Sequence, residues 1–141
     1  SEVQRAFDLC KQHSLTPPTV YQGLYNPLNR AVEEELLPVL KHNDCSFVAY
    51  NPLAAGLLAG KHTNAASDSN SKDHPDQDVL KGRFQNNPNY LPRFYTQANF
   101  DAIALIRKAC QAHDISMVEA TYRWMLCHSA LQAEKGDGLL L

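Results

Sequence analysis

Residues 46–61 read Ser-Phe-Val-Ala-Tyr-Asn-Pro-Leu-Ala-Ala-Gly-Leu-Leu-Ala-Gly-Lys, and they are the most informative part of the chain. Its first part, Ser46 to Ala49, is a short apolar run typical of a buried β-strand. Small residues follow, and the stretch ends at Lys61. Small side chains let backbone N–H groups come close to phosphate oxygens, and the lysine adds positive charge. Because the flat ring of Tyr50 could also face an aromatic group, the stretch predicts a nucleotide-cofactor site.

The composition is ordinary for a globular protein. The 141 residues, of which 44% are hydrophobic and 20% charged, are enough for one domain with a core. The net charge of −2 gives no basis for binding nucleic acid or an anionic membrane. No apolar run approaches the ~20 residues of a transmembrane helix, and the first residues lack a signal-peptide layout. We therefore expect neither a nucleic-acid nor a membrane partner.

The cysteines are widely scattered, at Cys10, Cys45, Cys110 and Cys127. None forms a Cys-x-x-Cys pair, and none has metal-ligand spacing with a histidine, which argues against a zinc site. Three lie within or beside apolar helical faces. We interpret them as buried reduced thiols of a cytoplasmic protein rather than as reactive residues.

The first half of the chain alternates helical and strand patterns. Apolar residues at helical spacing begin at Val3 and predict a helix that ends near His13. The β-branched and aromatic run Thr19 to Gln22 predicts a short strand, and residues 23–27 a loop.

A second helix and a second strand follow. Asn29 is the predicted N-cap of the helix, in which Pro38 predicts a kink or an early end. The run from Ser46 to Tyr50 is the second strand. Residues 62–99 then form a long polar connection, which is uncommon in a compact domain and often functional.

The last third predicts two helices and the beginning of a strand. One helix spans about Phe100 to His113, and a capping-box pattern at Ser116 opens another that ends near His128. Gly138 begins an apolar strand. Alternating strands and helices argue for an α/β fold with a parallel sheet.

Three segments together resemble one family. They are residues 18–26 (PTVYQGLYN), residues 50–61 and residues 122–125 (YRWM). The chain resembles the later half of an aldo-keto reductase, an NADPH-dependent (β/α)8 TIM-barrel enzyme. Within that family it is most similar to the aflatoxin-aldehyde reductases, which also reduce succinic semialdehyde. The resemblance implies that the parent protein reduces aldehydes or ketones to alcohols by hydride transfer.

The resemblance also implies where the chain lies in a barrel. The strands at residues 19–22 and 46–50 correspond to barrel strands six and seven, and strand eight starts at Gly138. A complete barrel needs about 250 residues. We therefore expect residues 1–141 to be a partial oxidoreductase domain, truncated at both ends, with residues 62–99 as a lid over a small carbonyl substrate.

The resemblance also implies roles for individual residues that match positions of the family's cofactor and substrate site. Gln22 matches the glutamine that hydrogen-bonds the nicotinamide carboxamide, for which a primary amide offers both a donor and an acceptor. Tyr50 matches the aromatic residue that stacks on the nicotinamide. The pyrophosphate loop corresponds to Asn51, Pro52, Leu53, Ala54, Gly56, Gly60 and Lys61. Arg83 matches an arginine near the adenosine phosphate, and Tyr90 and Arg93 match positions that meet a substrate carboxylate.

Two departures from the family pattern affect the interpretation. Ala55 and Ala59 stand where glycine and threonine are expected, and the methyl group of Ala55 restricts the approach of the backbone slightly. The family's catalytic Asp, Tyr, Lys and His come from the first four strand ends, and none of these lies in the chain. We therefore assign no catalytic residue and expect the chain alone to be inactive, with NADPH as cofactor and a homodimer allowed for the full-length protein.

Two other classes fit parts of the pattern. A non-catalytic NADPH-binding regulatory subunit, like the potassium-channel β subunits that share this fold, would carry the same 51–61 loop. Residues 21–26 and 82–84 favour the reductase subgroup, whereas a lost tyrosine or lysine in the first half of the gene would favour the regulator. An anion-binding α/β module unrelated to redox chemistry would require Gln22 and Tyr50 to be coincidental.

Overall fold

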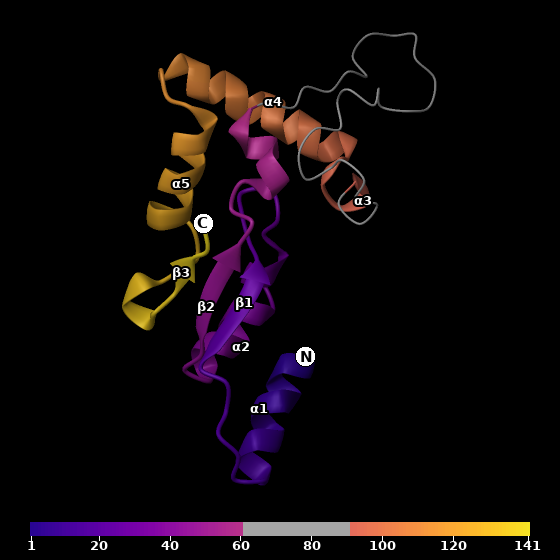
Figure 1. Ribbon diagram of the computed structural model, residues 1–141, viewed down its shortest axis with the longest axis vertical. Coiled ribbons are helices and arrows are strands. Elements are labelled where there is room, and N and C mark those ends of the chain that lie inside the picture. The colour runs from indigo at the N-terminus through magenta and orange to yellow at the C-terminus, as the bar shows by residue number, and fades with distance from the viewer. Residues whose placement is uncertain (61–90) are drawn as a thin grey trace. The chain divides into compact units, whose positions relative to one another are not determined.

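The computed structural model describes residues 1–60 and 91–141. The chain divides into two compact units, and Figure 1 labels their elements. The first unit comprises Ser1–Pro52 and Trp124–Leu141, and the second comprises Leu53–Arg123. Each unit is described by itself.

The first unit is built on a parallel sheet of three strands in the order β1 (Val20–Leu24), β2 (Ser46–Tyr50) and β3 (Gly138–Leu139) (Figure 1). Both pairings, β1 with β2 and β2 with β3, are parallel. The predicted parallel α/β architecture is thus confirmed. The bounds of β2 and the start of β3 lie where the sequence predicts them.

Two helices cover one face of this sheet. The helix α1 (Glu2–Gln12) is capped by the Ser1 side chain, which accepts a hydrogen bond from the N–H of Gln4, and the second helix is α2 (Leu36–His42). Their apolar side chains join those of the strands in one core. Its buried members are Phe7, Tyr25, Leu37, Leu40, Cys45, Phe47, Ala49 and Met125. Burial of these side chains is the main term that holds the unit together.

The first strand is longer than predicted. Gly23 and Leu24 belong to β1 rather than to a loop, and Gly23 pairs with Ala49. Glycine is depleted in strands because it adds no side chain to the packing. Here the missing side chain makes room for a neighbour: a Cβ on Gly23 would lie 2.6 Å from the ring of Phe47. The ring of Tyr21 stacks on Phe47 at a centroid distance of 6.0 Å.

The predictions for the second helix were partly wrong. The chain forms a 3-10 turn, η1 (Ala31–Glu33), and then breaks before α2, so Asn29 caps no α-helix. Pro38 neither kinks nor ends α2. It is the third residue of the helix, where the backbone N–H has no partner within the helix, so proline costs little.

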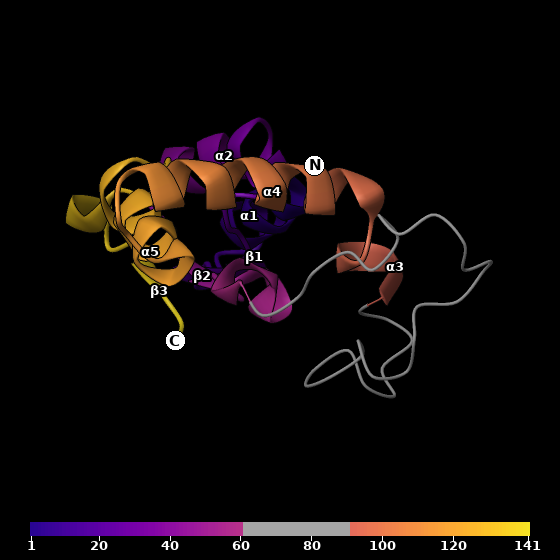
Figure 2. The same ribbon diagram turned by 90° about the horizontal axis from the view of Figure 1, so that it is seen from above.

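The second unit contains a 3-10 segment and three helices. They are η2 (Ala54–Ala59), α3 (Leu91–Phe94), α4 (Gln97–Ala112) and α5 (Met117–Cys127), the last continuing into the first unit. Figure 2 shows α4 as one unbroken helix. Ser116 accepts a hydrogen bond from the N–H of Glu119 at 3.0 Å, which confirms the predicted cap of α5.

The connection predicted at residues 62–99 overlaps these helices. The helix α3 and the start of α4 fall inside that range, and residues 62–90 lie outside the described residues. Thr96 explains the early start of α4, because its hydroxyl accepts a hydrogen bond from the N–H of Asn99. In the described ranges, no helix is both long and apolar enough to cross a bilayer.

Replacing Gly23 with alanine tests the tight contact beneath Phe47. The new methyl group would force the Phe47 ring out of place, and we expect the free energy of unfolding to fall by about 1–3 kcal/mol. Denaturant unfolding followed by circular dichroism measures this loss. The control is Gly138→Ala, because a Cβ there meets no atom within 4 Å. Equal effects of the two substitutions would contradict the account.

Candidate functional site

Gln22 and Tyr50 share one face of the sheet. Gln22 pairs with Val48 and Leu24 pairs with Tyr50, so Gln22 and Tyr50 are diagonal neighbours on adjacent strands. Side chains alternate between the faces of a strand. The opposite face carries Phe47, which packs in the core with the helices. The side chain of Gln22 is exposed and that of Tyr50 is half-buried.

The position of Gln22 differs slightly from the prediction. Because β1 continues to Leu24, Gln22 is the middle residue of the strand and does not lie at its end. Tyr50 is the last residue of β2, as predicted. Both residues still lie toward the carboxyl ends of parallel strands, which is where α/β folds bind ligands.

A left-handed turn follows Tyr50 directly. Asn51 has φ 60, a conformation that asparagine adopts more readily than most residues. Its carbonyl oxygen accepts a hydrogen bond from Nδ2 of Asn26 at 3.0 Å. Pro52 is buried. The end of β2 is thereby attached to the loop that follows β1.

Asn26 is fully buried, and its side chain bonds in two directions. While Nδ2 donates to Asn51, Oδ1 accepts the N–H groups of Leu28 and Asn29, each at 3.0 Å. A buried amide is stable only when its donors and acceptors are paired in this way. Asn26 belongs to the motif at residues 18–26, but the sequence predicts no role for it, since nothing in helical or strand periodicity marks a buried loop amide.

Tyr25 is the other buried polar residue at the end of β1. Its hydroxyl donates to Oε1 of Glu33 at 2.5 Å and accepts the N–H of Ala130 at 3.0 Å. Arg30 holds the same carboxylate through two bonds of 2.9 Å. The guanidinium group of Arg30 also lies 5.3 Å from the centre of the Trp124 ring. These contacts attach the loop after β1 to the segment that leads to β3.

The environment shifts two pKa values in opposite directions. Burial raises the pKa of Tyr25 to about 12, and the adjacent Glu33 carboxylate adds to the rise, although the Ala130 N–H opposes it. The hydrogen bonds from Arg30 lower the pKa of Glu33. The pair is therefore a neutral phenol beside a carboxylate at neutral pH, a structural arrangement with no free acid or base.

The loop in the second unit begins with three consecutive residues of positive φ. The φ angles are 49 at Ala54, 58 at Ala55 and 98 at Gly56, and Gly60 follows with φ 76. Non-glycine residues in this region each cost about 1–2 kcal/mol. Ala55, where the family pattern has glycine, is thus a source of strain. Leu57 and Leu58 are fully buried and anchor the loop.

Several N–H groups of this loop already have partners within it. Those of Gly56 and Leu58 donate to the carbonyl of Leu53, and that of Gly60 donates to Leu57. In this arrangement the glycines permit the turns rather than present donors. Arg107 of α4 donates to the carbonyl of Gly60 at 3.4 Å, a contact that the sequence does not predict.

The remaining predicted residues are placed only in part. Arg93 lies in α3 with an exposed side chain, and its guanidinium carbon is 5.8 Å from the centre of the Phe94 ring. Lys61, Arg83 and Tyr90 lie outside the described residues. In the described part of the chain, no cluster of three His, Cys, Asp or Glu side chains suits a metal ion.

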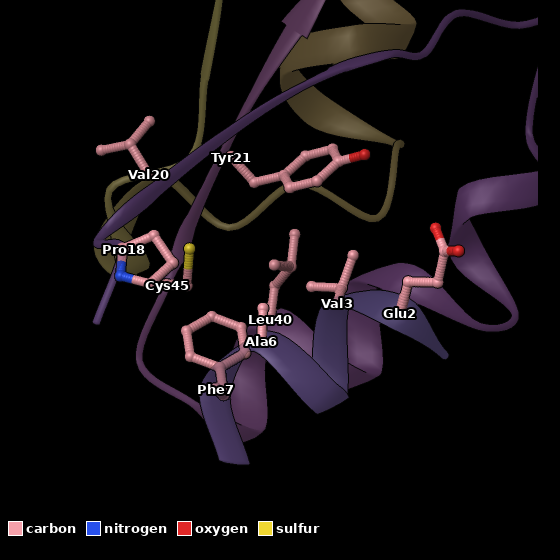
Figure 3. Close-up of a pocket in the computed structure, with 9 residues that line it drawn as sticks. All are labelled: Glu2, Val3, Ala6, Phe7, Pro18, Val20, Tyr21, Leu40 and Cys45. Atoms are coloured by element: carbon pink, nitrogen blue, oxygen red, sulfur yellow. The ribbon is translucent and has the colours of Figure 1, made fainter. Parts of the chain in front are cut away.

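A separate cavity of about 240 Å³ lies between α1 and the sheet. Figure 3 shows Phe7, Leu40 and Cys45 beneath the ring of Tyr21, with Val20 and Pro18 beside them. The lining is almost entirely apolar. It offers no convergent polar groups that would suit a phosphate or a carboxamide, so the candidate site remains the face of Gln22 and Tyr50.

Residues 1–138 of the chain match the Aldo/keto reductase family. The chain belongs to this family. Aflatoxin B1 aldehyde reductase member 2 of Rattus norvegicus is 42% identical over 147 aligned positions, which include 99% of the chain and 38% of that relative. Aldo-keto reductase family 7 member A3 of Homo sapiens is 44% identical, with 99% and 42% covered. Oxidoreductase sirO of Leptosphaeria maculans is 31% identical, with 99% and 40% covered. This aldo-keto reductase chain thus spans about two-fifths of the length of these relatives.

Tyrosine ionisation tests the network around Tyr25. Because the folded state favours the neutral phenol, the stability that it contributes is complete below about pH 10 and is lost as the pH rises toward 12. Burial also raises the pKa of Tyr95, so we expect an ultraviolet titration of the folded chain to show more than one late-ionising tyrosine, and Tyr25→Phe to reduce the amplitude of the late step by one tyrosine. A late step of unchanged amplitude in the variant would contradict the assignment.

Proposed function

We propose that this chain supplies the cofactor contacts of an NADPH-dependent reductase of aldehydes and ketones. One observation carries the proposal: Gln22 and Tyr50 share a face of the sheet, and the chain passes from Tyr50 directly into a left-handed loop of small residues. Membership of the Aldo/keto reductase family supports it. The names of the relatives, which include aflatoxin B1 aldehyde reductases, favour an aldehyde as substrate.

Gln22 and Tyr50 suit the nicotinamide in their chemistry. The exposed amide of Gln22 offers a donor and an acceptor to a carboxamide, and the half-buried ring of Tyr50 offers a flat apolar surface. When bound, NADPH supplies the hydride that reduces a carbonyl carbon. The role of Gln22 and Tyr50 would be to orient the nicotinamide ring.

The loop after Tyr50 has the small side chains that a pyrophosphate site needs, while the N–H groups of Gly56, Leu58 and Gly60 are paired within the loop. Residues Asn51, Pro52, Leu53, Ala54, Gly56 and Gly60 would wrap it, and Lys61 would add a positive charge. Positive φ angles at Ala54 and Gly56 bend the backbone without a bulky side chain. Arg83 would meet the adenosine phosphate, and Tyr90 and Arg93 a substrate carboxylate, with residues 62–99 as a lid.

The strands β1, β2 and β3 would then be strands six, seven and eight of a (β/α)8 barrel. We assign no catalytic residue in residues 1–141. We expect the proton donor to lie in the part of the full-length protein that corresponds to the unmatched region of the relatives. The chain by itself is expected to show no turnover.

The test uses a full-length protein that contains this chain. We expect it to consume NADPH when given a short semialdehyde, which absorbance of the reduced nicotinamide measures. Tight NADPH binding without turnover on aldehydes or ketones would contradict the enzyme and favour the regulatory subunit. Absence of NADPH binding would contradict both.

Two matched substitutions test the face of the sheet. Tyr50→Leu removes the ring on the proposed nicotinamide face, and Tyr21→Leu makes the same change on the opposite face. We expect Tyr50→Leu to weaken NADPH binding about twofold to tenfold, since aromatic stacking contributes about 0.5–1.5 kcal/mol beyond burial. Tyr21→Leu should lower stability but leave NADPH affinity unchanged. Unchanged NADPH affinity in Tyr50→Leu, with weaker binding in Tyr21→Leu, would contradict the proposed role of Tyr50.

A further inference from the structure

We infer, on the basis of the proposed function, that Asn26 is a positioning residue that fixes the turn at Asn51 after β2 and thereby orients Tyr50. Asn26 lies in the loop after β1, outside the ladder that pairs β1 with β2. Its side-chain amide bonds directly to the turn at Asn51. No part of its role requires contact with the cofactor.

The Asn26 side chain continues the strand pairing past its last residue. The ladder between β1 and β2 ends at Leu24 and Tyr50, and the N–H of Tyr25 still reaches the Tyr50 carbonyl at 3.5 Å. At the next residue the main chain turns away, because the N–H of Asn26 donates to Asn29 instead. In place of the Asn26 main-chain N–H, its side-chain Nδ2 donates a hydrogen bond to the Asn51 carbonyl at 3.0 Å.

The orientation of the amide is fixed by its other end. Oδ1 accepts two N–H groups, from Leu28 and Asn29, and the whole residue is buried. A flipped amide would place its N–H bonds against these two donors and its oxygen against the Asn51 carbonyl. Aspartate would keep the acceptor and lose the donor, and when ionised it would also place a second oxygen against the Asn51 carbonyl, so Asn26→Asp breaks this bond and adds repulsion at the turn.

The bond bears on the part of the chain that carries the proposed site. Asn51 has a left-handed backbone, which non-glycine residues adopt infrequently, and it joins Tyr50 to the small-residue loop. Without the bond from Asn26, this turn has one constraint fewer. We therefore expect a loss of affinity for the nicotinamide and pyrophosphate part of the cofactor, and none for the adenosine part.

The experiment compares two asparagines in the full-length protein. Asn43 also donates its Nδ2 to a backbone carbonyl, that of Val39 at 2.8 Å, but it lies at the other end of β2. Asn26→Asp and Asn43→Asp are measured by calorimetric titration with NADPH and with its adenosine bisphosphate half. Asn26→Ala repeats the test without a charge.

We expect Asn26→Asp and Asn26→Ala to bind NADPH about tenfold more weakly, because both lose the hydrogen bond to the Asn51 turn and Asn26→Ala also loses the two bonds at Oδ1. Both variants should bind the adenosine half as the unsubstituted protein does. Asn43→Asp should bind both ligands normally. The retained adenosine affinity shows that the variants fold. Equal losses for both ligands, or normal NADPH affinity in the Asn26 variants, would overturn the role of Asn26. Failure of the unsubstituted protein to bind NADPH would instead overturn the proposed function.

Discussion

The parallel pairing of β1 with β2 is the constraint on which the rest of the first unit depends. The Phe47 ring lies against Gly23, where a side chain would collide with it, so the observed register is compatible with a residue that has no side chain at position 23. That register places Gln22 and Tyr50 on the face opposite the helical core. Side chains alternate along a strand, so a slip of one residue would turn Tyr50 into the core.

Buried polar side chains at the end of β1 attach the loop after this strand to other segments of the chain. Tyr25 links the loop after β1 to Ala130, and Asn26 links it to Asn51. Both residues are fully buried, and leaving either without its partners would cost about 1–3 kcal/mol per unpaired group. They give the ends of the strands a defined conformation where an apolar core alone would not. A site that must hold a flat ring in one orientation needs such definition.

The sequence predicted much of the fold because its strongest signals are local. The run from Ser46 to Tyr50 and the cap at Ser116 depend on neighbours along the chain, and both were right. The extension of β1 through Gly23 depends on a distant ring, that of Phe47, and was missed. Asn26 was missed for the same reason, since its partner Asn51 is far away in sequence. The family resemblance, and not periodicity, pointed to Gln22 and Tyr50.

The central claim is that the face carrying Gln22 and Tyr50 holds the nicotinamide. A crystal structure of the full-length protein with bound NADP⁺ tests it most directly. We expect the nicotinamide ring to stack on Tyr50 and its carboxamide to lie within hydrogen-bonding distance of Gln22. A nicotinamide bound elsewhere, with Gln22 and Tyr50 in contact only with protein or solvent, would contradict it.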